Sequence, residues 1–85
     1  MTKSINYLKI IIKNKNNESV EEEVSALSSF NEKGPFDILP LHENFISIIT
    51  DKIILHKKDG TSKEIAIERG VLKIIENQVS VYLGV

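Results

Sequence analysis

The sequence contains no cysteine, only two prolines and four glycines, and almost no net charge. The lack of cysteine excludes disulfides, thiolate metal sites and a cysteine nucleophile. A formal net charge of −1 lacks the basic footprint that nucleic-acid binding leaves. No apolar run approaches the ~20 residues of a membrane-spanning helix, and residues 1–9 are too polar for a signal peptide. We therefore expect a soluble chain, which can still dock on a membrane assembly.

A chain of 85 residues is long enough for one domain with a single modest core. Its hydrophobic share of 41% and charged share of 27% are ordinary for a soluble globular protein. The sequence shows no internal repeat, low-complexity tract or linker. We expect residues 1–85 to form a single domain.

Most of the chain alternates apolar and polar residues with a period of two, which is typical of half-buried β-strands. This pattern predicts strands over residues 7–13, 36–39, 45–49, 52–57, 63–68, 71–75 and 79–83. Asp59 and Gly60 form the strongest hairpin signal, because both residue types tolerate the backbone of a tight turn. Short strands separated by frequent turns predict an all-β sandwich or barrel. The pattern does not specify which strands pair.

Residues 34–45 contain both prolines, two of the three phenylalanines and one of the two histidines. Pro35 and Pro40 lack a backbone donor, so neither can lie centrally in a hydrogen-bonded sheet. Pro40 also pushes Leu39 towards an extended conformation. We expect a rigid, extended, partly apolar connector that includes a short edge strand.

This segment reads Gly-x-Phe-x-Ile-Leu-Pro-x-His-x-x-Phe. It resembles the Gly-x-Phe-Gly-Ile-Leu-Pro-Gly-His-Ala-x-Phe/Leu signature of the β-sandwich domain in epsilon subunits of rotary F-type ATP synthases. The opening strand, the Asp-Gly hairpin and the last two strands of that family have counterparts at residues 8–11, 59–60, 65–74 and 77–81. The resemblance therefore covers nearly the whole chain. It implies a two-sheet β-sandwich of about eight to ten short strands.

The sequence departs from the family pattern at three glycines and in its length. Asp37, Leu41 and Arg69 stand where the family has glycine. Because leucine tolerates a left-handed backbone poorly, we expect the loop to differ in conformation. Many members continue into C-terminal helices that can restrain ATP hydrolysis and, in some, bind nucleotide, whereas this sequence stops at Val85. Either the sequence is shortened or the natural protein lacks those helices.

Residues 18–30 fit two patterns. Val20, Val24 and Leu27 have the spacing of one helix face, and a capping-box pair begins the segment. With a period of two, the same residues read as a strand. The local pattern slightly favours a helix, but the family has an extended segment here, and we adopt the strand.

No pattern in the sequence predicts catalysis, a metal site or a cofactor. His42 and Glu43 are neighbours, so in an extended stretch their side chains point in opposite directions. We expect His42 to hydrogen-bond within the loop or to meet a partner, and His56 to be an exposed strand residue. The acidic run at residues 21–23 fits a solvated edge that discourages aggregation. We expect no active site, no cofactor, and no nucleotide binding in the absence of the C-terminal helices.

The resemblance implies a non-catalytic subunit of the central stalk, which links the gamma subunit to the membrane c ring and couples rotation to ATP synthesis or hydrolysis. The complex would translocate protons or sodium ions, with this subunit on the cytoplasmic side, peripheral to the inner or plasma membrane. The alternative is a free-standing β-sandwich interaction module with an unrelated partner.

The expected contact residues for the c ring are Pro35, Pro40, Leu41, His42 and Glu43. The two prolines fix the shape of the segment before docking, so little conformational entropy is lost on binding. Leu41, which replaces a glycine, is the apolar residue of this segment most expected to be exposed. The gamma subunit would take a sheet face or edge instead.

Overall fold

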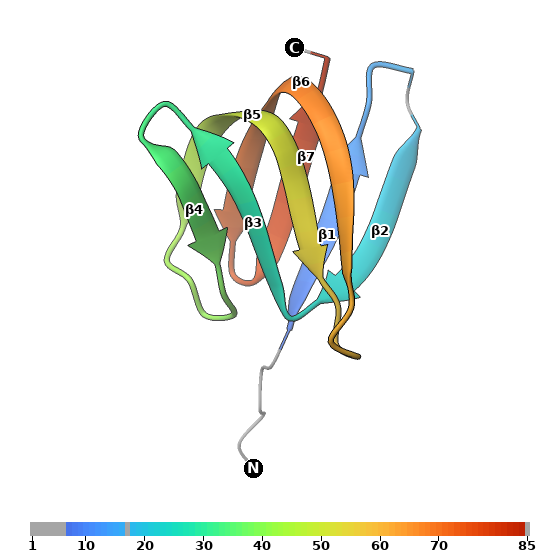
Figure 1. The fold of residues 1–85 in the computed structure, drawn as a ribbon, viewed down its shortest axis with the longest axis vertical. Helices are drawn as coiled ribbons and strands as arrows, with labels where there is room; N and C mark the ends of the chain where they lie inside the picture. The colour runs from blue at the N-terminus through green and yellow to red at the C-terminus, as the bar shows by residue number, and fades with distance from the viewer. Residues whose placement is uncertain (1–6, 17, 85) are drawn as a thin grey trace.

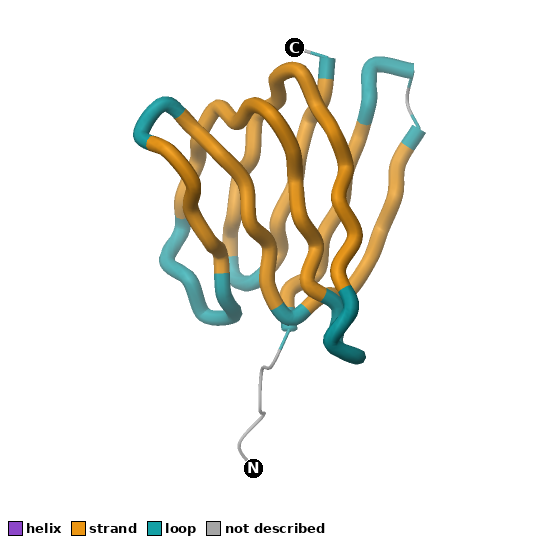
Figure 2. Tube along the Cα trace, viewed as in Figure 1, coloured by secondary structure: helices purple, strands orange, loops and turns teal. Residues whose placement is uncertain are grey.

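The computed structural model describes residues 7–16 and 18–84. This part of the chain contains β-strands and no helix. The predicted polar N-terminus at residues 1–6 lies outside the described residues. The strands are β1 Leu8–Lys13, β2 Ser19–Val24, β3 Ala26–Asn31, β4 Gly34–Ile38, β5 Phe45–His56, β6 Ser62–Ile75 and β7 Gln78–Leu83. The all-β class is confirmed, and residues 18–30 form strands instead of a helix (Figure 2). The described residues contain no helix long and apolar enough to cross a membrane.

All seven strands belong to one hydrogen-bonded sheet with the order β2-β1-β7-β6-β5-β3-β4. The first and last strands, β1 and β7, pair in parallel, and every other pairing is antiparallel. β2 and β4 are therefore the two edge strands. The parallel pairing brings residues from the two ends of the sequence side by side (Figure 1).

The sheet makes two layers because its two longest strands bend. The pairing of β5 with β6 changes register between Thr50 and Lys52, and Asp51 between them has a φ of 76°. Such an irregularity kinks a strand and increases its twist without ending it. The halves of β5 and β6 on either side of the bend consequently lie in different layers (Figure 1). Four predicted strands are thus halves of two continuous ones. The described residues form seven strands, where about eight to ten were expected.

The inward faces of the two layers enclose an aliphatic core. Its buried hydrophobic residues are Leu8, Ile10, Ile12, Val24, Leu27, Ile38, Ile49, Ile53, Leu55, Leu72, Ile74, Val79 and Val81. Ser29 is the buried polar residue of the described chain, and its hydroxyl donates to the Lys52 carbonyl across 2.8 Å. This bond satisfies a carbonyl at the bend, where the pairing of β3 with β5 also loses register.

Candidate functional site

The loop between β4 and β5 is shaped by a tight turn at residues 39–42. The backbone N–H of His42 donates to the Leu39 carbonyl across 3.1 Å, and Leu41 has a φ of 69°. Proline followed by a residue with positive φ is the pattern of a type II turn, in which glycine is the usual third residue. Leu41 thus occupies the left-handed conformation that a leucine was expected to avoid. Its side chain is 73% exposed, which confirms the predicted exposure.

Two hydrogen bonds fasten this loop to the turn between β6 and β7. The Leu41 N–H donates to Asn77 Oδ1 across 2.6 Å, and the Glu76 N–H donates to Asn44 Oδ1 across 3.3 Å. The Asn77 carbonyl in turn accepts from the N–H of Lys9 in β1 across 3.0 Å. The loop is therefore held by contacts to elements distant in the sequence, which lowers the entropy it loses on docking.

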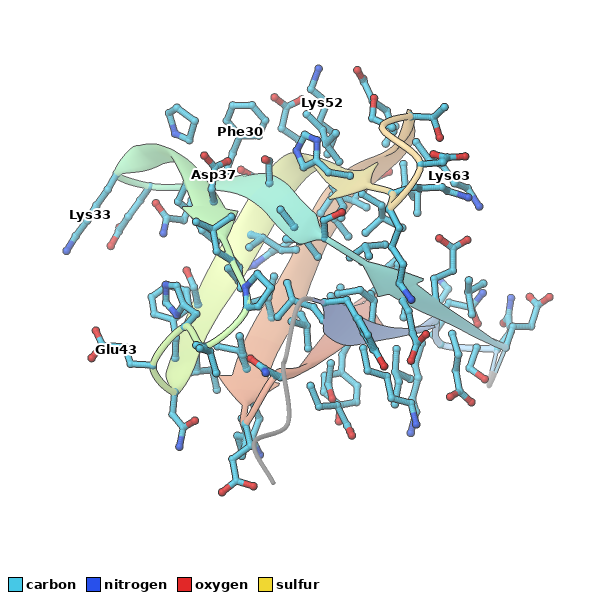
Figure 3. The ribbon with its side chains drawn as sticks, turned by 90° about the horizontal axis from the view of Figure 1, so that it is seen from below. Phe30, Lys33, Asp37, Glu43, Lys52 and Lys63 are labelled. Atoms are coloured by element: carbon cyan, nitrogen blue, oxygen red, sulfur yellow. The ribbon has the colours of Figure 1, made fainter. Side chains whose placement is uncertain are left out.

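His42 and Glu43 take different surroundings within the loop. His42 Nδ1 lies 2.8 Å from the Glu43 carbonyl, and because a carbonyl only accepts, Nδ1 carries the proton. The imidazole ring also meets Phe45 edge to face at 5.7 Å, and Phe45 meets Phe36 in the same way at 5.7 Å. The expected hydrogen bond of His42 within the loop is confirmed. Glu43 is exposed, as Figure 3 shows at the rim of the sandwich.

The five predicted contact residues fall into two groups. Pro35 lies at the start of β4, next to the β3–β4 turn, whereas Pro40 and Leu41 follow the far end of that strand (Figure 1). Ile38 between them is buried and belongs to the core. The structure therefore brings residues 40–43 together in one loop and places Pro35 at the opposite end of the sandwich.

His56 is not the exposed strand residue that the sequence predicted. It is half-buried, and its Nε2 lies 2.8 Å from Ser28 Oγ, which lies 2.5 Å from Asp37 Oδ1. A carboxylate only accepts, so the Ser28 hydroxyl donates to Asp37 and His56 Nε2 donates to Ser28. This order differs from a nucleophile with a histidine base, in which the serine donates to the histidine. The cluster joins β4, β3 and β5, and only their pairing reveals it.

The acidic run of β2 is paired with lysines of the β5–β6 hairpin. Glu22 lies 3.7 Å from Lys57 and 3.4 Å from Lys63, and Glu23 lies 3.2 Å from Lys58. β2 is an edge strand, as expected, but these pairs connect it to a hairpin with which it shares no backbone ladder. No group of three or more His, Asp or Glu side chains in the described residues is arranged to hold a metal ion.

A largely apolar surface lies on the outer side of the layer that contains β7. Its exposed members are Ile46, Ile48, Ile75 and Tyr82, with exposed fractions of 66, 50, 44 and 40%. The two isoleucines of β5 also line a groove whose charged residues are Glu32, Lys33 and Arg69. The sequence analysis did not identify this surface, although residues 45–49 and 71–75 carry apolar side chains on both faces of their strands. Contiguous exposed apolar residues on a small domain mark a protein contact.

The sandwich is similar in structure to chains of two mitochondrial ATP synthases. A search of curated protein sequences found no match. The fold is similar to a chain of the Euglena gracilis mitochondrial ATP synthase, with a TM-score of 0.87 and 14% identity. It is also similar to a chain in the central stalk and c-ring structure of the Tetrahymena thermophila mitochondrial ATP synthase, with a TM-score of 0.72 and 8% identity.

Both matches cover 96% of this chain but only 53% and 66% of the matched chains, so this sequence spans about half and two thirds of their lengths. At sequence identities of 14% and 8%, these structural similarities show only that the fold is shared. The family is shown by the sequence itself, because the family model for the beta-sandwich domain of the ATP synthase delta/epsilon chain matches residues 7–83. The chain therefore belongs to the ATP synthase delta/epsilon chain family, of which it carries the β-sandwich domain.

Proposed function

We propose that this chain is a non-catalytic central-stalk subunit of a proton- or sodium-translocating F-type ATP synthase, in which it links the gamma subunit to the c ring. The family match over residues 7–83 is the observation that carries this proposal. In this role the subunit is a single sandwich domain without an active site of its own. It is peripheral to the inner or plasma membrane, on the cytoplasmic side.

The geometry supports a part that transmits torque by staying attached to two partners. A continuous seven-stranded sheet with an aliphatic core resists shear between its ends. The loop at residues 39–44 adjoins the apolar outer surface, because Asn44 lines one hollow with Ile46 and Ile75. We assign the c ring to the loop, through Pro40, Leu41, His42 and Glu43, and the gamma subunit to a sheet face.

The loop suits this role because its shape is fixed before binding. Pro40 restricts the turn, and Asn77 holds the Leu41 amide at 2.6 Å, while the Leu41 side chain stays 73% exposed. An exposed apolar side chain on a held backbone buries area on docking at little entropic cost. Pro35, which the sequence also predicted as a contact for the c ring, lies at the other end of β4. A substitution there therefore tests the opposite end of the sandwich.

The test is binding of the purified chain to the gamma subunit and to a detergent-solubilised c ring with gamma attached. Leu41→Asp is expected to weaken the interaction with the ring by about tenfold or more, which corresponds to ~1.4 kcal/mol or more, while gamma binding and thermal stability are retained. Ala66→Asp places the same charge on the outer face of β6 and is the matched control. Pro35→Asp reports on the opposite end of the sandwich.

Three outcomes would contradict the assignment. Loss of folding in Leu41→Asp would show that this side chain supports the core. Normal ring binding by Leu41→Asp together with weakened binding by Pro35→Asp would place the docking end at the β3–β4 turn. If the wild-type chain binds neither partner, the central-stalk role is wrong, and the sandwich is an interaction module for a different protein.

A further inference from the structure

The apolar outer surface has a lysine at its centre. We call this surface the β5–β6–β7 face; its outward residues are Ile46, Ile48, Val71, Lys73, Ile75, Ser80 and Tyr82. The strand register places Ile46 opposite Lys73 on one side and Ser80 opposite it on the other. Val71 and Ile75 lie two residues away along β6 and point to the same side. A partner that covers the isoleucines must therefore also cover the Lys73 ammonium.

The described lysines divide into five that form salt bridges and four that form none, which are Lys13, Lys15, Lys33 and Lys73. Lys9, Lys52, Lys57, Lys58 and Lys63 each lie within 4.0 Å of a glutamate carboxylate. Within residues 7–16 and 18–84, no salt bridge or side-chain hydrogen bond involves Lys73. Glu76 lines a hollow together with Lys73, Ile75 and Tyr82, but it forms no salt bridge with Lys73. The face thus combines an apolar surface with an unpaired positive charge.

We propose that Lys73 determines which segment of the gamma subunit binds this face: an apolar segment that carries a carboxylate opposite the Lys73 ammonium. The inference rests on the proposed function, because it specifies how gamma is recognised. Docking removes water from the lysine, and leaving an ammonium unpaired in an apolar contact is costly. A carboxylate at that position offsets the cost and fixes the register of the segment.

The same lysine disfavours association of the chain with itself through this face. In a two-fold symmetric dimer the same patch meets its own copy. Lys73 of one copy would then approach Lys73 of the other within an apolar contact, and juxtaposed like charges are costly. Lys73 therefore favours a carboxylate-bearing partner over a second copy of this chain.

The test measures binding of purified gamma to the wild-type chain and to Lys73→Glu, Lys73→Gln and Lys73→Leu. Lys15→Glu is the control, because it makes the same change of charge in the exposed β1–β2 turn. We expect Lys73→Glu to raise the Kd for gamma by about tenfold or more and Lys15→Glu to leave it within about twofold. The wild-type Kd should rise more steeply with sodium chloride than that of Lys73→Gln, since salt screens the charge pair.

Lys73→Leu is expected to form dimers in sedimentation velocity, whereas the wild-type chain stays monomeric.

Failure of the inference is distinct from failure of the proposed function. If the wild-type chain does not bind gamma, the central-stalk role is wrong and the partner of this face is another protein. If the wild-type chain binds gamma but a folded Lys73→Glu binds as tightly as Lys15→Glu, the role stands and Lys73 does not recognise a carboxylate. Equal salt dependence of wild type and Lys73→Gln would overturn the charge pairing. A monomeric Lys73→Leu would overturn the effect on self-association.

Discussion

Replacing Asn77 by alanine is expected to destabilise the protein and to release the β4–β5 loop. The Asn77 Oδ1 accepts the Leu41 N–H at 2.6 Å, and loss of such a bond costs about 0.5–1.5 kcal/mol. Asn77 also has a φ of 66°, a conformation that asparagine visits routinely but that costs other residues with a Cβ roughly 1–2 kcal/mol. The two contributions together predict a loss of about 1.5–3.5 kcal/mol of unfolding free energy in Asn77→Ala.

A glycine at the same position separates the two contributions. Asn77→Gly also loses the hydrogen bond but relieves the backbone strain of ~1–2 kcal/mol, against an entropic cost of ~0.5–1 kcal/mol. We therefore expect Asn77→Gly to be more stable than Asn77→Ala by up to about 1.5 kcal/mol. Urea unfolding of the three proteins measures these differences, and amide hydrogen exchange at Leu41 should accelerate in both variants. An unchanged exchange rate at Leu41, or an Asn77→Gly variant that is less stable than Asn77→Ala, would refute the reasoning.

Three further substitutions test other parts of the sandwich. In Gly70→Ala the added Cβ would lie 3.0 Å from the Tyr82 carbonyl oxygen, so urea unfolding should show a loss of about 1–3 kcal/mol; wild-type stability would contradict that contact. Ser28→Ala should cost about 1–2 kcal/mol, and NMR of the wild type should find the His56 proton on Nε2; a proton on Nδ1 alone would contradict the hydrogen-bond order. Hydrogen bonds from the side chain and backbone of Thr61 lower the pKa of Asp59 below its ordinary value of 3.8, so the charged form stabilises the folded state above that value. That stabilisation is lost as the pH falls through the lowered pKa, and the difference in Tm between wild type and Asp59→Asn should shrink accordingly; a difference independent of pH would contradict it.

Local sequence was sufficient for most of the strands. Period-two alternation predicted β1, β4 and β7 to within a few residues, because side chains alternate between faces along any extended strand. Asp59 and Gly60 marked the β5–β6 hairpin for the same kind of local reason. The segment at residues 18–30 needed the family resemblance, since its apolar spacing fits a helix as well. A bend at Ser25 changes the alternation there, so that Val24 and Leu27 are both buried.

The full length of β5 and β6 could not be predicted from the sequence. Thr50-Asp51 and Arg69-Gly70 read as interruptions, because aspartate and glycine are depleted in strands. In the structure the ladder continues past them, since a bulge preserves hydrogen bonds on both sides while it redirects the strand. The bend that makes two layers from one sheet is thus a property of the paired strands, and neither strand specifies it alone.

The candidate contact sites were likewise predicted in part from the sequence and decided in part by the tertiary structure. The sequence by itself predicted a rigid segment at residues 40–43, because proline restricts its own backbone and that of its neighbour. The exposure of Leu41 was predicted from the family resemblance, in which glycine occupies this position. Only the tertiary structure decided that Asn77 holds this loop, that Ser28 joins His56 to Asp37, and that Lys73 lies within an apolar face. Each of these depends on pairing between strands distant in the chain, such as β1 with β7. Periodicity fixes which side of a strand a residue occupies, whereas its neighbours on that side are fixed by strand order and register.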